Sequence, residues 1–202
     1  YTPPEITYFV PSEGSRINGN QQITARATDN INVSSFSFTY STDGGSTWVD
    51  IGEDTSPSYN IYYKYWYSTI YFDTTLVSDG MVIVKVTATD IGGNTGELMR
   101  NYEIDNTPPA VPQDVTAEAG QREVRLSWSP VEDPHLSGYR VYRSTTQGGE
   151  YSYLTYTSNT SYTNTGLTPD TTYYYVVTAV DLAGNESAYS QEVSATPVED
   201  YT

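Results

Sequence analysis

The residues of this 202-residue sequence whose type and spacing could support binding chemistry are its aromatic side chains, which include 21 tyrosines. They are most concentrated in the segment 59–72. If that segment is extended, alternate side chains share a face, so Tyr63, Tyr65 and Tyr67 would line one face and Trp66 the other. Only one face can be core. The remaining row of rings could stack on sugars, bind a neighbouring module or simply cover a sheet edge. These four side chains are the candidate ligand-binding residues.

Carboxylates far outnumber cationic side chains, with 25 Asp and Glu against nine Lys and Arg and a formal net charge of −16. This charge opposes binding to nucleic acid or to an anionic membrane surface. Calcium is the one cation worth considering, because oxygen-rich clusters at module junctions can hold it. Asp29 and Asp105, each followed by an asparagine, are the candidate metal ligands, and the alternative is that both simply form turns.

Residues that could carry catalysis are sparse. The single histidine, His135, lies in a loop next to a proline, and no serine lies in a nucleophile-elbow pattern. The chain has no cysteine, which excludes disulfides and thiolate metal sites. Paired carboxylates could act as acid and base, but they need a cleft that small β-sandwiches rarely provide. We therefore expect no enzymatic activity and no cofactor apart from the calcium considered above.

Short stretches of alternating apolar and polar residues recur along the chain, and none shows a sustained helical period. Residues 81–89 form the clearest predicted strand, with Val82, Val84 and Val86 on one face. Clusters of Asp, Gly and Ser separate the stretches and indicate turns. The pattern predicts an all-β chain.

Three prolines between residues 105 and 112 indicate a domain boundary, because proline removes backbone donors and stiffens the chain. We expect one domain over 1–106, a second over 107–198 and a short tail over 199–202. Both halves carry a similar Asp-to-Asn turn after a strand, which indicates that they are built on related plans.

The acids in these turns have a local mechanical explanation, since Asp90 and Asp181 can each accept hydrogen bonds from nearby backbone amides. The run 41–48 matches the Asp-box pattern of sialidase propellers, in which Asp and Gly shape a hairpin turn and a tryptophan, here Trp48, packs beneath it. A propeller enzyme would show several copies at blade spacing, and this sequence has one. We interpret the motif as structural.

Several features of the second half are typical of one protein family. They are Pro112, Trp128 at the end of a predicted strand, and the runs 138–143 and 167–179. With these residues, 110–197 resembles a fibronectin type III domain. The resemblance implies that Trp128 lies between the sheets and that Tyr173 is a corner tyrosine whose hydroxyl ties back to upstream backbone. The Arg-Gly-Asp tripeptide of integrin-binding members is absent, so that activity is not implied.

The first half resembles a bacterial immunoglobulin-like domain, through Pro3–Pro4, the run 27–36 and the run 79–94. It departs from that pattern in residues 56–72, which are longer and more aromatic than expected. The two resemblances together imply an all-β fold of two tandem immunoglobulin-like β-sandwiches.

The expected function is that of a non-catalytic accessory or spacer region of a larger secreted or cell-surface bacterial protein. Its partners would be the other domains of the same polypeptide, which it orients or stabilises. The alternative is an adhesion module that binds a polysaccharide or a surface protein through residues 59–72. We expect a monomer outside the cell or at its surface, without membrane insertion, because no run of 18 apolar residues occurs. No targeting leader precedes Tyr1, so we expect any export signal to lie outside this sequence.

Overall fold

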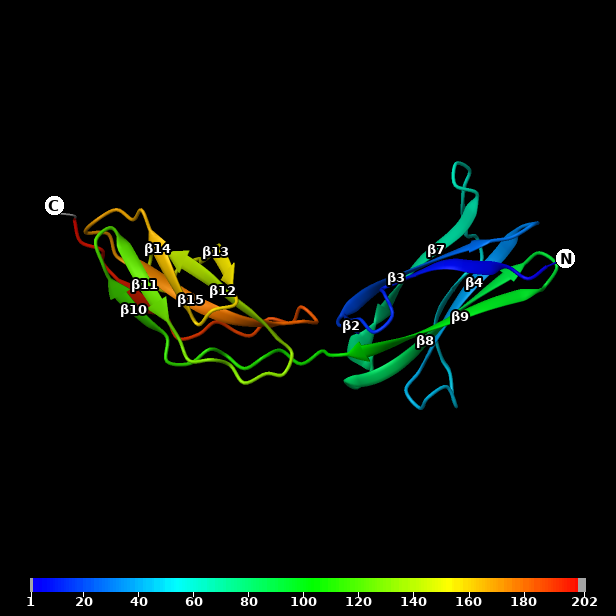
Figure 1. Cartoon of the computed structure of the whole chain (residues 1–202), viewed down its shortest axis with the longest axis horizontal. Helices are drawn as coiled ribbons and strands as arrows, with labels where there is room; N and C mark the ends of the chain where they lie inside the picture. The colour runs from blue at the N-terminus through cyan, green and yellow to red at the C-terminus, as the bar shows by residue number, and fades with distance from the viewer. Residues whose placement is uncertain (1, 200–202) are drawn as a thin grey trace. The chain divides into compact units, whose positions relative to one another are not determined.

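The computed structural model describes residues 2–199, and the chain divides between Asn106 and Thr107 into two compact units (Figure 1). Both units are β-sandwiches, so the predicted all-β fold of two tandem immunoglobulin-like sandwiches is confirmed. Of the tail expected over 199–202, only Glu199 belongs to the described residues. In the part of the chain that is described, no helix has the length and apolar character needed to cross a membrane.

The first unit contains two sheets. One has four antiparallel strands in the order β1-β3-β7-β6, and the other has five strands in the order β2-β9-β8-β4-β5, in which β2 and β9 are parallel. In chain order the elements are β1 (Glu5–Val10), β2 (Arg16–Ile17), β3 (Asn20–Thr28), β4 (Val33–Ser41), β5 (Val49–Asp54), β6 (Ser58–Asn60), β7 (Tyr65–Asp73), the 3-10 helix η1 (Thr74–Leu76), β8 (Gly80–Asp90) and β9 (Thr95–Ile104).

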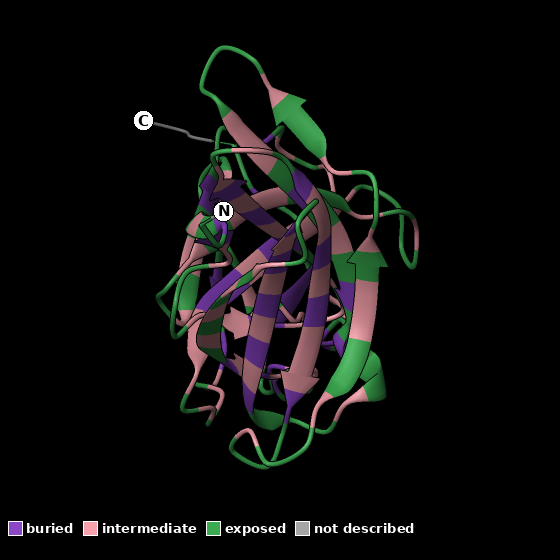
Figure 2. Cartoon of the chain, turned by 90° about the vertical axis from the view of Figure 1, so that its right-hand side faces the viewer, coloured by how far each residue is buried: buried purple, intermediate pink, exposed green. Residues whose placement is uncertain are grey.

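The core of the first unit follows the two-residue period of its strands. Val82, Val84 and Val86 of β8 are buried, and the residues between them are partly exposed, as the alternation in 81–89 predicts. Figure 2 shows this alternation as purple and pink bands along the strands. Phe36 and Phe38 of β4 complete the same core. The burial of each such side chain contributes roughly 1.5–3 kcal/mol to the free energy of unfolding.

The second unit pairs a three-stranded sheet, β10-β11-β14, with a four-stranded sheet, β13-β12-β15-β16, and all pairings within them are antiparallel. Its core is rich in tyrosine, with Tyr139 and Tyr175 almost fully buried beside Val141 and Val177. The strands are β10 (Thr116–Ala119), β11 (Glu123–Ser127), β12 (Leu136–Ser144), β13 (Ser152–Thr157), β14 (Ser161–Thr165), β15 (Tyr173–Asp181) and β16 (Val193–Ala195).

The two units close equivalent turns with similar hydrogen bonds to an aspartate. Asp90 Oδ1 accepts from the backbone N of Gly92 and Asn94 at 2.7 and 2.9 Å, and its Oδ2 accepts from Asn94 Nδ2 at 2.8 Å. Asp181 Oδ1 accepts from the backbone N of Gly184, three residues on rather than two, and of Asn185, and its Oδ2 accepts from Asn185 Nδ2. The hydrogen bond from the Asn94 side chain outweighs burial and holds the pKa of Asp90 below its ordinary value. Both acids therefore act as turn formers.

Candidate functional site

The aromatic segment 59–72 is a hairpin rather than one extended ribbon, which corrects the arrangement expected from sequence. Strands β6 and β7 pair in an antiparallel register around a tip at residues 61–64. Asn60 Oδ1 accepts hydrogen bonds from the backbone N of Tyr62 and Tyr63, and Lys64 adopts a left-handed φ of 55°. The amide side chain thus satisfies donors that a continuous strand would pair with a neighbour, and the alternation breaks there.

The predicted faces hold within β7. Tyr65 and Tyr67 point away from the core, and their ring centroids lie 6.0 Å apart in an edge-to-face arrangement. Tyr63, at the hairpin tip, stacks on Tyr65 at 6.2 Å with only 13° between the ring planes. Trp66 points the other way, packs against the core and has the ring of Tyr59 at 4.7 Å. Three of the four candidate residues therefore gather on one face, and Trp66 belongs to the packing beneath it.

The same face includes two residues that sequence reasoning missed. Strand register places Tyr8 of β1 and Tyr67 of β7 on either side of Arg26 in β3. The Arg26 guanidinium lies 4.3 Å from the ring centre of Tyr8 and 4.7 Å from that of Tyr65, so it makes cation–π contacts with both rings. These contacts join a side chain of β3 to rings of β1 and β7 and so fix the orientation of both rings.

We call Tyr8, Arg26, Tyr63, Tyr65 and Tyr67 the aromatic face. Tyr63 is 75% exposed and Tyr67 37% exposed, so both present ring surface to solvent. The five residues of the face include no carboxylate, thiol or imidazole. Exposed rings of fixed orientation can instead stack on the apolar face of a ligand.

The two acids expected to bind calcium lie at opposite ends of the first unit. Asp29 directly follows the last residue of β3, whereas Asp105 follows β9 at the end where β3 begins, beside the hydrogen bond between Gly19 N and Asn106 Oδ1. They cannot share one ion. Asp29 Oδ1 accepts a turn hydrogen bond from Ile31 N at 2.8 Å. Within residues 2–199 no group of three or more His, Cys, Asp or Glu side chains is placed to hold a metal, and calcium at either end stays a prediction.

The Asp-box motif forms a hydrogen-bonded turn between β4 and β5. Asp43 accepts from the backbone N of Thr47 at 2.9 Å and from the hydroxyls of Thr47 and Ser41, each at 2.7 Å. These bonds, with the Thr47 amide contributing most, hold the pKa of Asp43 well below its ordinary value. Trp48 lies against this turn, where a Cβ on Gly45 would be 3.5 Å from its ring, and Lys85 Nζ lies 4.5 Å above the ring.

The two framework aromatics of the second unit serve its packing. Trp128 is 5% exposed and lies between the sheets, with its ring centroid 5.4 Å from that of Tyr139. The Tyr173 hydroxyl accepts a hydrogen bond from Thr168 N at 3.1 Å, which ties β15 back to upstream backbone.

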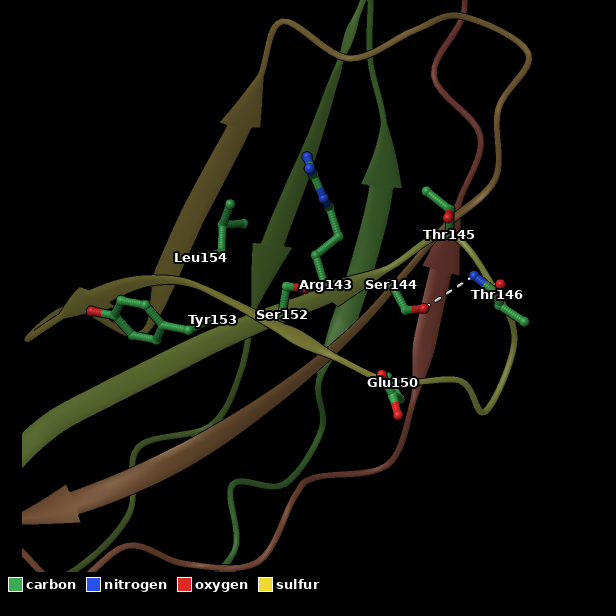
Figure 3. Close-up of a pocket in the computed structure, with 8 residues that line it drawn as sticks. All are labelled: Arg143, Ser144, Thr145, Thr146, Glu150, Ser152, Tyr153 and Leu154. Atoms are coloured by element: carbon green, nitrogen blue, oxygen red, sulfur yellow. Dashed lines mark hydrogen bonds between the residues drawn. The ribbon is translucent and has the colours of Figure 1, made fainter.

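A pocket of about 360 Å³ opens where β12 ends and β13 begins (Figure 3). Its cationic residue, Arg143, already donates to Asn164 Oδ1 at 3.0 Å and lies 5.1 Å from the ring centre of Tyr173. The residues around it are Arg143, Ser144, Thr145, Thr146, Glu150, Ser152, Tyr153 and Leu154. The set includes one carboxylate, Glu150, and the Ser144 hydroxyl accepts from Thr146 N at 3.1 Å and so caps its own turn.

Comparison with known proteins finds a family model that matches the second unit and several relatives that match longer parts of the chain. The family model of the fibronectin type III domain matches residues 110–196. An amylopullulanase of Thermoanaerobacter thermohydrosulfuricus is 38% identical over 128 residues, which is 61% of this chain and 8% of the relative. Exoglucanase B of Cellulomonas fimi is 34% identical over 67% of this chain and 13% of its own length. Chitinase Chi52 of Paenibacillus xylanexedens is 40% identical over 46% of this chain and 17% of its own length.

The chain thus spans less than a fifth of each of these relatives. Among solved structures, the fibronectin(III)-like modules of Clostridium thermocellum CbhA align with 97% of this chain and 94% of theirs, at a TM-score of 0.57 and 16% identity. Domains A168–A170 of titin align with 98% of this chain and 67% of theirs, at a TM-score of 0.58 and 16% identity. At this identity both likenesses show the fold alone.

Proposed function

The chain is an immunoglobulin-like β-sandwich followed by a fibronectin type III domain, and on this basis we propose that it is a non-catalytic accessory region of a larger secreted or cell-surface enzyme that degrades polysaccharides. One observation carries the proposal: the chain aligns with a small part of several large enzymes, named as an amylopullulanase, an exoglucanase and a chitinase. The framework of turn acids and packed aromatics supports a structural role in such a protein.

The accessory role we propose is to space and orient neighbouring domains. The junction over 105–112 supports this role, because Pro108, Pro109 and Pro112 each fix a backbone dihedral and restrict the chain between the two units. A spacer gains from such stiffness, since a flexible tether would leave its neighbours free to rotate.

Small-angle scattering tests the spacer role directly. We expect the scattering of the wild-type chain to fit a narrow range of arrangements, and a variant with Pro108 and Pro112 replaced by Gly to fit a broader ensemble. Thermal melts of both proteins check that neither unit has unfolded. A wild-type chain that scatters like two freely jointed bodies would overturn the proposed role.

A second candidate function is glycan binding by the aromatic face. The observation that favours it is the set of exposed rings held in place around Arg26, beside the Thr24 and Thr69 hydroxyls, which lie 2.8 Å apart on the same sheet. Rings supply stacking surface and hydroxyls supply hydrogen bonds, which is the combination that a sugar requires.

Electrophoresis in gels that contain starch, cellulose derivatives or soluble chitin tests this candidate, with and without calcium. If the face binds, Tyr63→Ala and Tyr67→Ala remove the retardation in one glycan. Tyr156→Ala is the matched control, because Tyr156 is 45% exposed but belongs to the second unit. Equal retardation of all three variants and the wild type would exclude this face as the site. Retardation that needs calcium would support an ion at Asp29 or Asp105.

A further inference from the structure

A second group of tyrosines lies on the second unit, outside both the aromatic face and the buried core. Tyr153, Tyr142, Tyr189 and Tyr151 form a chain of edge-to-face contacts, with ring centroids 5.9, 5.2 and 5.5 Å apart in that order. They stand on the outer face of the sheet that contains β12 and β15, away from the core. Tyr153 is 58% exposed and Tyr189 50% exposed, so both present ring surface to solvent.

Beside these rings, Glu186 is fixed by three donors from two strands. Its Oε1 accepts from the Tyr142 hydroxyl at 2.5 Å and from Thr178 Oγ1 at 2.6 Å, and its Oε2 accepts from Arg140 Nη1. Thr178 is 1% exposed and is one of the residues that line a hollow of about 460 Å³. The hollow is lined by Tyr142, Thr178, Glu186, Ser187, Ala188 and Tyr189.

The charge and the hydrogen-bonding groups of the hollow indicate which class of ligand it can bind. Arg140 compensates the charge of Glu186, so the hollow holds no net charge to attract a cationic or an anionic group. Each carboxylate oxygen can accept two hydrogen bonds, and Glu186 Oε2 accepts one from the described part of the chain, which leaves a position for a donor from a ligand. A half-exposed tyrosine ring beside an oriented acceptor matches a molecule with an apolar face and hydroxyl edges.

We propose that this hollow binds a neutral oligosaccharide, with the Tyr189 ring stacked on a sugar ring and Glu186 Oε2 accepting from a sugar hydroxyl; the choice of a sugar rests on the proposed function in a polysaccharide-degrading enzyme. Arg140 and Tyr142 act as positioning residues, since they hold the carboxylate in place. The site is separate from the aromatic face, so either can fail without the other.

NMR titration of the complete chain with maltohexaose, and separately with cellohexaose, tests the proposal. We expect one of the two sugars to shift the amide signals of residues 186–190 and of Tyr142. In the same titration, Tyr189→Ala should weaken binding about tenfold or more, the scale seen when a stacking partner is removed. Glu186→Gln keeps the shape of the side chain and should weaken binding as well.

Tyr156→Ala provides the matched control. Tyr156 is 45% exposed on the same sheet, but its hydroxyl bonds to Ser137 Oγ and it does not line the hollow, so we expect unchanged binding. The proposal is overturned if neither sugar shifts residues 186–190, or if Tyr156→Ala weakens binding as much as Tyr189→Ala. Shifts confined to the first unit would overturn it as well and leave glycan binding by the aromatic face standing. A response to hexa-arginine but to neither sugar would make the hollow a peptide site.

Discussion

The behaviour of Glu186 illustrates how single residues are tuned in this protein. Burial opposes its ionisation, but the hydrogen bonds from Thr178 and Tyr142 and the charge of Arg140 outweigh burial and lower its pKa. The opposite shift occurs in the phenols: burial and a hydrogen bond to Glu186 raise the pKa of Tyr142, and burial with a bond to Glu192 raises the pKa of Tyr151 to about 12. At neutral pH Glu186 is therefore an acceptor, and the phenols of Tyr142 and Tyr151 are donors.

Glu186→Gln should destabilise the second unit by about 1.5–3 kcal/mol at pH 7, because hydrogen bonds to a charged acceptor are lost. The ordinary pKa of a glutamate is near 4.5, and a carboxyl whose pKa is lower in the folded state stabilises the fold at pH values above 4.5. This stabilisation is lost as the pH falls through the lower pKa of the folded state. The difference in unfolding free energy between wild type and variant should thus be largest near neutral pH and shrink towards pH 3. Urea titrations at several pH values measure it, and a difference independent of pH would contradict the assignment.

At the scale of strands, sequence predicted what depends on local pattern and missed what depends on register. The alternation of Val82, Val84 and Val86 was enough to place β8, because one buried face imposes a period of two. The single ribbon over 59–72 was wrong because the Asn60 side chain nucleates a turn that alternation does not reveal. Arg26 lies on the aromatic face because β3 pairs with β1 and β7. This register joins residues far apart in the sequence, and no local pattern predicts it.

The contact between β9 and the segment before β1 allows a sharp test at this scale. A Cβ placed on Gly96 would lie 1.8 Å from the backbone oxygen of Pro4, so Gly96→Ala must push two segments apart. We expect a loss of about 1–3 kcal/mol in the stability of the first unit, as for other overpacked sites. Gly52→Ala is the control, because a Cβ there meets nothing within 4 Å, and its effect should stay within about 0.5 kcal/mol. Calorimetry that resolves the two units would measure both, and equal effects would show that the Pro4 contact is not tight.

At the scale of the whole molecule, the two units have separate cores. Each of the two clusters of buried side chains draws its residues from one unit alone. The boundary is closed from the side of the first unit: Asn106 Oδ1 accepts from Gly19 N at 3.0 Å and from Thr74 Oγ1 at 2.9 Å, and its Nδ2 donates to Thr74 O at 3.0 Å. Asn106 thus belongs to the first sandwich, and the prolines that follow it begin the junction.

This arrangement predicts where the chain can be cut. A fragment that ends at Asn106 should fold and melt at the same temperature as the first unit does within the complete chain. A fragment that ends at Ile104 leaves the Gly19 amide without the acceptor that Asn106 supplies, although the Thr74 hydroxyl keeps the Gly19 carbonyl as an acceptor, and it should lose about 1–3 kcal/mol. Calorimetry of both fragments beside the complete chain checks this. If the longer fragment melts well below the complete chain, the first sandwich draws stability from its neighbour, and the two units are not independent bodies joined by a spacer junction.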